Sequence, residues 1–94
     1  MTDLTKLAED SYTSAFRRFP NSDSGNVIQK IHEEIHELED AYLNEGLSVH
    51  CPELTEKEEE FADIIFACLV FAKCENIDIE KALRVKNEFN KTRQ

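Results

Sequence analysis

The sequence is poor in residues that interrupt helices and in residues that build tight turns. Its 94 residues include only two glycines and two prolines, and tryptophan is absent. Three cysteines, Cys51, Cys68 and Cys74, form an odd set without CxxC spacing, so a disulfide framework is not indicated. We expect buried free thiols, as in a reducing compartment.

Positive charge is also scarce, and so are long apolar runs. Eleven Lys and Arg residues face 20 Asp and Glu residues, which gives a net charge of −9. This balance argues against a nucleic-acid partner, which would need clustered basic side chains. No apolar run approaches the length of a membrane span, and the first residues, MTDLTKLAED, lack the pattern of a signal peptide. We therefore expect a cytoplasmic protein with no membrane partner.

What is present is helical periodicity. The length predicts one small domain over residues 1–94, close to the size at which a single core becomes marginal. Apolar spacings of one, three and four residues predict a helix over about 4–19, ended by Pro20, and a second from 24–26 to about 44–46. A third should begin at the capping box of Thr55 and Glu58 and end near Cys74. The fourth should run from the N-cap Asp78 to about Thr92, which makes an all-α, four-helix chain.

The third helix is apolar around its whole circumference. Residues 61–72, FADIIFACLVFA, contain a single charged side chain, Asp63. A helix apolar on all sides is buried on all sides, and this chain has too few other helices to surround it. We therefore expect an oligomeric helical bundle, a homodimer or a homotetramer. Asp63 would be a carboxylate inside a buried wall, which a metal ion or a basic group must compensate.

Two pairs of carboxylates point to a metal site. Glu34 and Glu37 lie at i and i+3 on one flank of the apolar stripe of the second helix. Glu60 and Asp63 have the same spacing on the third helix. Four carboxylates around one cavity suit Mg²⁺ or Mn²⁺, with substrate phosphates completing the coordination shell. The sequence therefore predicts a buried acidic metal site that could clamp phosphates and activate water.

Other interpretations of the same residues remain open. Carboxylate pairs are common on solvated faces, and we expect other glutamates to be such charges, namely Glu33, Glu39, Glu56, Glu58 and Glu59. The string HEEIH, 32–36, matches the HExxH of zinc proteases, but His32 and His36 fall on the opposite flank from Glu34 and Glu37. The same stretch contains one Glu-x-x-His motif, Glu33 to His36. A di-iron bundle needs two such motifs, and a homodimer could supply the second. A non-catalytic interaction module would leave Asp63 unexplained.

The two acidic motifs together resemble a known family. EEIHE at 33–37 is followed by EFAD at 60–63, with the apolar continuation IIFACLVFA. This arrangement is similar to the EExxE and ExxD helices of the MazG-like all-α nucleoside triphosphate pyrophosphohydrolases, over roughly residues 25–93. The resemblance implies an obligate oligomer built around four-helix cores.

The resemblance also implies a site and a reaction. Mg²⁺ would be held by Glu34, Glu37, Glu60 and Asp63, and a (d)NTP would be hydrolysed to the monophosphate and pyrophosphate, as in control of the nucleotide pool. Lys86, Asn87 and Arg93 resemble family positions that touch substrate phosphate, although terminal basic residues also serve the helix dipole. Phosphoribosyl-ATP pyrophosphatase is similar in both acidic helices and is the alternative. The Lys86-Asn87 pair resembles the MazG-like branch more than it resembles phosphoribosyl-ATP pyrophosphatase.

Overall fold

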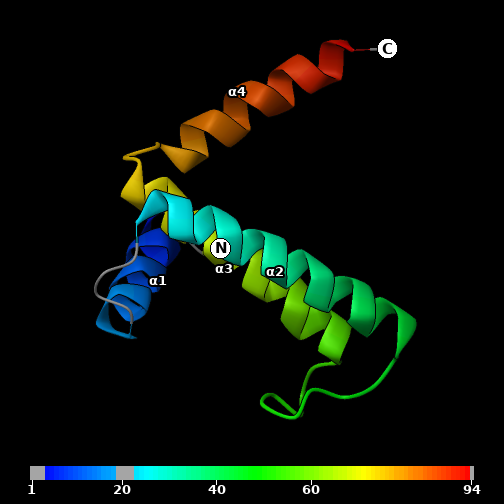
Figure 1. Ribbon diagram of the computed structural model, residues 1–94. Helices are drawn as coiled ribbons and strands as arrows, with labels where there is room; N and C mark the ends of the chain where they lie inside the picture. Colours follow the sequence, from blue (N-terminus) through cyan, green and yellow to red (C-terminus); the bar gives the residue numbers. More distant parts are fainter. Residues whose placement is uncertain (1–3, 19–22, 94) are drawn as a thin grey trace.

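Four α-helices make up almost all of the described chain. The computed structural model describes residues 4–18 and 23–93. Within these ranges the helices are α1 (Leu4–Arg18), α2 (Ser24–Leu43), α3 (Glu56–Cys74) and α4 (Ile79–Thr92) (Figure 1). The β-type pairing there is limited to one isolated antiparallel bridge between Leu47 and Thr55. The all-α, four-helix prediction is confirmed, while Phe19 and Pro20, which were expected to end the first helix, lie outside the described residues.

Side-chain caps fix where three of the helices begin. The Asp23 carboxylate accepts a hydrogen bond from the Asn26 amide at 2.9 Å and starts α2. Thr55 and Glu58 form the predicted capping box at the start of α3. Asp78 accepts from the Lys81 amide at 3.0 Å and starts α4, as predicted. Each cap satisfies amide groups that have no partner within the helix itself.

The end of α3 is a Schellman turn. Asn76 has a φ of 54°, the left-handed region that asparagine tolerates better than most residues. Its amide donates to the carbonyl of Lys73 at 3.3 Å, and the Ile77 amide donates to that of Ala72 at 2.8 Å. These two bonds satisfy the last carbonyl groups of α3 and turn the chain toward α4.

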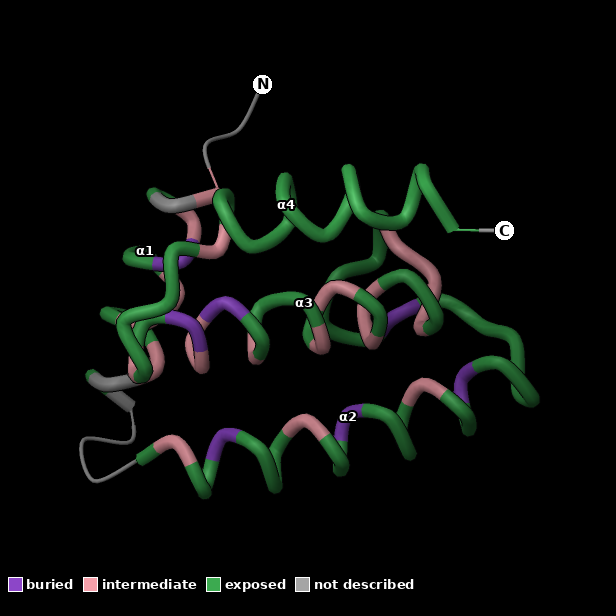
Figure 2. The backbone as a smooth tube through the Cα atoms, turned by 90° about the horizontal axis from the view of Figure 1, so that it is seen from above, coloured by how far each residue is buried: buried purple, intermediate pink, exposed green. Residues whose placement is uncertain are grey.

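Three helices pack together and the fourth extends away from them. Helices α2 and α3 lie side by side in antiparallel directions, and α1 packs against α3 (Figures 1 and 2). Helix α4 diverges from this group and buries none of its residues. The buried apolar residues are small or medium in size: Ala8, Val27, Ala41, Leu69 and Ala72. A core this small stabilises one chain only weakly.

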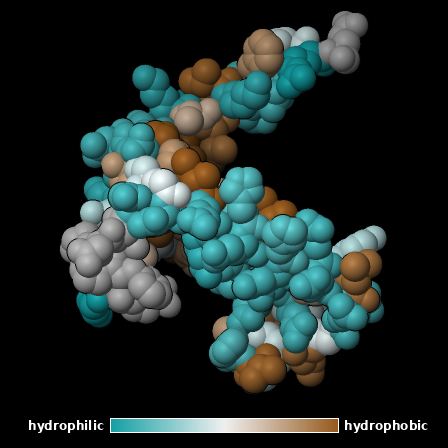
Figure 3. All heavy atoms as spheres, viewed as in Figure 1, coloured by the Kyte–Doolittle hydropathy of each residue, from teal (hydrophilic) through white to brown (hydrophobic). Residues whose placement is uncertain are grey.

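Large apolar side chains remain on the surface of the single chain. Phe61 is 57% exposed, and Ile65 and Phe66 are each 43% exposed. The expectation that a second copy buries this wall stays a prediction, but in the single chain Asp63, between them, is exposed as well. The reason is that α1 and α2 cover only part of α3. In Figure 3 hydrophilic side chains cover much of α2, whereas hydrophobic ones gather on α4 and on the loop after α2.

The structure also bears on the cysteine thiols and on membrane-spanning helices. Cys51 and Cys68 are exposed and Cys74 is half-buried, so the prediction of buried thiols is wrong for the first two. All three thiols are free. None of the four helices in the described ranges combines the length and the hydropathy that crossing a lipid bilayer would require.

Candidate metal centre

Three of the four predicted ligands come together where α2 and α3 face each other. Glu34 and Glu37 project from α2, and Glu60 projects from α3. One carboxylate oxygen from each lies within 4.8 Å of the others. Glu34 is 3% exposed, Glu60 is half-buried and Glu37 is exposed. The cluster therefore has a buried inner side and an open outer side.

The buried side of the cluster has fewer hydrogen-bond donors than its carboxylate oxygens need. Oε1 of Glu34 forms a 2.8 Å ion pair with Nζ of Lys30, one turn earlier on α2. Oε2 of Glu34 and Oε2 of Glu60 are both buried and have no hydrogen-bond partner among the described residues. Buried polar atoms are nearly always satisfied, and leaving one unpaired costs about 1–3 kcal/mol. Two such oxygens in one carboxylate cluster are what a divalent cation would satisfy.

Proton affinity in the cluster reflects the crowding of negative charge. Burial raises the pKa of Glu60 from 4.5 to about 8, and carboxyl contacts and repulsion with Glu37 and Glu34 add to the rise. The pKa of Lys30 is raised, chiefly by its hydrogen bond to Glu34. A proton or a metal ion must therefore neutralise part of the cluster near neutral pH.

Asp63 lies at the margin of this cluster. Its oxygens do not join the group of three within 4.8 Å. Partial desolvation nonetheless raises the pKa of Asp63, and the charges of Glu34, Glu59 and Glu37 raise it further. The residue is thus close enough to feel the cluster electrostatically.

A pocket of about 290 Å³ opens beside the cluster. Glu37 and Glu60 line it, together with residues of α2, of the loop after it and of the start of α3: Asp40, Ala41, Asn44, Val49, His50, Glu56 and Glu59. Among the glutamates expected to be solvated, Glu33, Glu39 and Glu58 are exposed, whereas Glu56 and Glu59 are half-buried in this pocket wall. His50 was missed, because no spacing rule connects a loop residue to a helix face.

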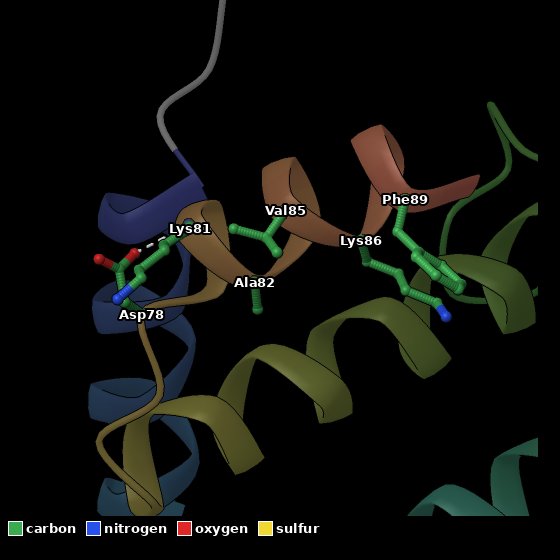
Figure 4. Close-up of a pocket in the computed structure, with 6 residues that line it drawn as sticks. All are labelled: Asp78, Lys81, Ala82, Val85, Lys86 and Phe89. Carbon is green, nitrogen blue, oxygen red and sulfur yellow. Dashed lines mark hydrogen bonds between the residues drawn. The ribbon is translucent and has the colours of Figure 1, made fainter. Parts of the chain in front are cut away.

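The residues predicted to contact substrate phosphate lie on α4 or at its end, away from the acidic cluster. Lys86, Asn87 and Arg93 belong to α4 or its C-cap. Lys86 lines a shallow groove of about 680 Å³ whose six lining residues all come from α4 and its N-cap Asp78 (Figure 4). Its Nζ lies 4.6 Å from the ring centre of Phe89, and Cζ of Arg93 lies 5.7 Å from the same point. The single chain does not bring these cations to the pocket beside the acids.

The two histidines of the HEEIH string are exposed on α2. Within the described residues, the one set of side chains positioned to share a metal ion consists of three glutamates and no histidine. An all-oxygen donor set suits a hard cation, whereas zinc proteases use imidazole ligands. The geometry therefore favours the carboxylate interpretation of this stretch over the zinc and di-iron ones.

Comparison with known proteins supplies one match. The sequence model of the family described as phosphoribosyl-ATP pyrophosphohydrolase matches residues 3–90, nearly the whole chain. This family is of the MazG-like all-α type, so the predicted resemblance is confirmed. Neither the curated proteins nor the solved structures contain a significant match.

Proposed function

The chain belongs to the phosphoribosyl-ATP pyrophosphohydrolase family, and on that premise we propose that it hydrolyses a (deoxy)nucleoside triphosphate to the monophosphate and pyrophosphate with the help of Mg²⁺. The family supports pyrophosphohydrolase activity in general. The observation that carries the metal-dependent site is the cluster of Glu34, Glu37 and Glu60, with two buried oxygens that have no hydrogen-bond partner in the described part of the chain.

The residues fit a divalent metal ion. Glu34, Glu37 and Glu60 would hold it, and Asp63 would serve as the fourth ligand from the same helix as Glu60. Mn²⁺ suits the same oxygen donors. When bound, the ion supplies a Lewis acid for the phosphate chain and a lowered pKa for water.

The protein's own residues prepare the site. Lys30 holds Oε1 of Glu34, which leaves Oε2 of this buried carboxylate available to a metal ion. The pocket of about 290 Å³ beside Glu37 and Glu60 gives the phosphate chain a route to the cluster. We propose that one of the clustered carboxylates accepts the proton of the attacking water. Attack at the α-phosphorus then releases pyrophosphate.

Activity should require a homodimer or a homotetramer. The core of one chain is small, and the apolar side chains of α3 and α4 are exposed. A second copy of the same chain would cover them, since a self-complementary contact is the commonest way to close such a surface. In that assembly α4 of one copy could bring Lys86, Asn87 and Arg93 to substrate phosphates held by another.

Phosphoribosyl-ATP is the second candidate substrate, because the matching family is described by it. It carries the same triphosphate chain, so the acidic cluster would bind and hydrolyse that chain in the same way in both substrates. The shape of the pocket around the base and sugar decides between them.

The test is pyrophosphate release from the canonical ribo- and deoxyribonucleoside triphosphates and from phosphoribosyl-ATP, with Mg²⁺ and then with EDTA. We expect release that needs the metal and is lost in Glu37→Ala. The matched control is Glu39→Ala, which removes an exposed carboxylate from the same helix and should leave turnover unchanged. Absence of release from every substrate would contradict the proposal, and release from phosphoribosyl-ATP alone would establish the second candidate.

A further inference from the structure

The loop between α2 and α3 is irregular but is held by many hydrogen bonds. The Ser48 amide donates to the carbonyl of Leu54 at 2.9 Å, and the Glu56 amide donates to that of Gly46 at 2.9 Å. Oγ of Ser48 accepts from the Cys51 amide at 2.9 Å, and Ser48 is 3% exposed. These bonds fold residues 46–56 back on themselves, so the loop gives its side chains defined positions.

This loop places His50 against the wall of the acidic pocket. Nδ1 of His50 lies 3.4 Å from Oε1 of Glu59, whose side chain is 16% exposed. Glu59 precedes Glu60 on α3 and therefore belongs to the same rigid helix as the proposed metal ligand. The imidazole itself is 85% exposed, so it does not contribute to the core. A histidine held by a carboxylate at one nitrogen keeps the other nitrogen for a ligand.

The pocket needs a positive group if it is to take a phosphate chain. Five of its lining residues are acids, Glu37, Asp40, Glu56, Glu59 and Glu60. His50 is the one lining side chain that can carry a positive charge, and Asn44 adds a neutral amide. Phosphate oxygens that do not face the metal would otherwise meet carboxylates, and like charges at close range repel.

We infer that His50 is a further substrate-binding residue, which donates a hydrogen bond from Nε2 to a phosphate oxygen of the nucleotide. Glu59 acts through His50 as a positioning residue, because it holds Nδ1 and fixes the plane of the ring. Because Nδ1 faces Glu59, Nε2 is the ring nitrogen left for the phosphate oxygen. This inference rests on the proposed function, since it assumes that the pocket receives the phosphate chain of a nucleotide.

The test compares His50→Ala, His50→Gln and the control His32→Ala, which removes an exposed imidazole from α2 outside the pocket lining. The probe is imidodiphosphate, a pyrophosphate analogue that resists hydrolysis, whose dissociation constant is measured by calorimetry with Mg²⁺ present. Loss of one charge-assisted hydrogen bond should weaken binding about tenfold or more in His50→Ala. His50→Gln keeps a donor and should lose less, while His32→Ala should bind like wild type.

Three further measurements separate binding from structure. The affinity for Mg²⁺ alone and the unfolding temperature should be unchanged in His50→Ala, and KM for the nucleotide should rise by the same factor as the dissociation constant. Glu59→Gln should weaken imidodiphosphate binding by a smaller factor. Adding it to His50→Ala should cause no further loss, because the two residues act through one hydrogen bond to the ligand.

The possible failures are distinguishable. A wild-type protein that releases pyrophosphate, with His50→Ala binding imidodiphosphate equally well, overturns the role of His50 and leaves the proposed function intact. A fall in binding that is matched by a fall in Mg²⁺ affinity or in unfolding temperature shows that His50 only tethers the loop. A wild-type protein that neither turns over a nucleotide nor binds imidodiphosphate overturns the proposed function and this inference together.

Discussion

Replacing Glu60 with glutamine should make the metal-free protein more stable at alkaline pH. Burial and the neighbouring Glu37 and Glu34 raise the pKa of Glu60 from 4.5 to about 8 in the folded protein. Between these two values the folded state keeps a proton that the unfolded state has released. Stability therefore falls as pH rises from about 4.5 to 8, which is the opposite of the usual salt-bridged carboxylate. Glutamine has the shape of the protonated form and carries no such penalty.

The size of the effect follows from the shift in pKa. At about 1.36 kcal/mol for each unit, the full shift of Glu60 corresponds to about 5 kcal/mol. The cluster borders an open pocket, where water screens part of the repulsion, so we expect about 2 kcal/mol at pH 8. For a domain of this size that gain raises the unfolding temperature by roughly 8 °C or more. At about pH 5 most of the wild-type Glu60 penalty has disappeared, and the two proteins should agree within about 0.5 kcal/mol.

The assay is thermal unfolding followed by circular dichroism, at one protein concentration and with EDTA present, across pH 5 to 8.5. A fixed concentration matters because association of chains also shifts the unfolding temperature. Glu39→Gln is the control, since it removes one negative charge from an exposed position of α2. If Glu60→Gln and Glu39→Gln differ equally little from wild type at pH 8, the reasoning about the cluster is refuted. Addition of Mg²⁺ should stabilise the wild type and stabilise Glu60→Gln less.

The remaining predictions concern the other side chains of the site and α4. Lys30→Met should lower the free energy of unfolding by about 1–3 kcal/mol in EDTA, because it leaves the buried carboxylate of Glu34 without its cation, and Mg²⁺ should restore part of the loss in a urea titration. Asp63→Asn should abolish pyrophosphate release while the unfolding midpoint stays equal or rises; loss of folding with unchanged activity per folded molecule would exclude Asp63 as a ligand. Phe89→Glu, on the exposed apolar face of α4, should reduce the sedimentation coefficient to that of a monomer, and an unchanged coefficient would remove α4 from the interface.

Local features of the sequence were enough to determine the helices. The capping box at Thr55 and Glu58 and the N-cap Asp78 depend on residues three positions apart, so they can be identified without any tertiary contact. The i, i+3 spacing likewise placed Glu34 and Glu37 on one face of α2. This spacing is a property of the helix itself. The sequence alone therefore revealed both acidic motifs and, through them, the family resemblance.

Tertiary packing decided which carboxylates meet and which groups surround them. The sequence could not show that Glu60 approaches Glu34 and Glu37 more closely than Asp63 does, because that depends on how α2 and α3 are rotated against each other. Nor could it place His50 beside Glu59, since the path of the loop between the helices is fixed by hydrogen bonds such as those of Ser48. The sequence determined the helices and their acidic faces through local, periodic interactions. The arrangement of charges around one pocket arose from contacts between residues far apart in the chain.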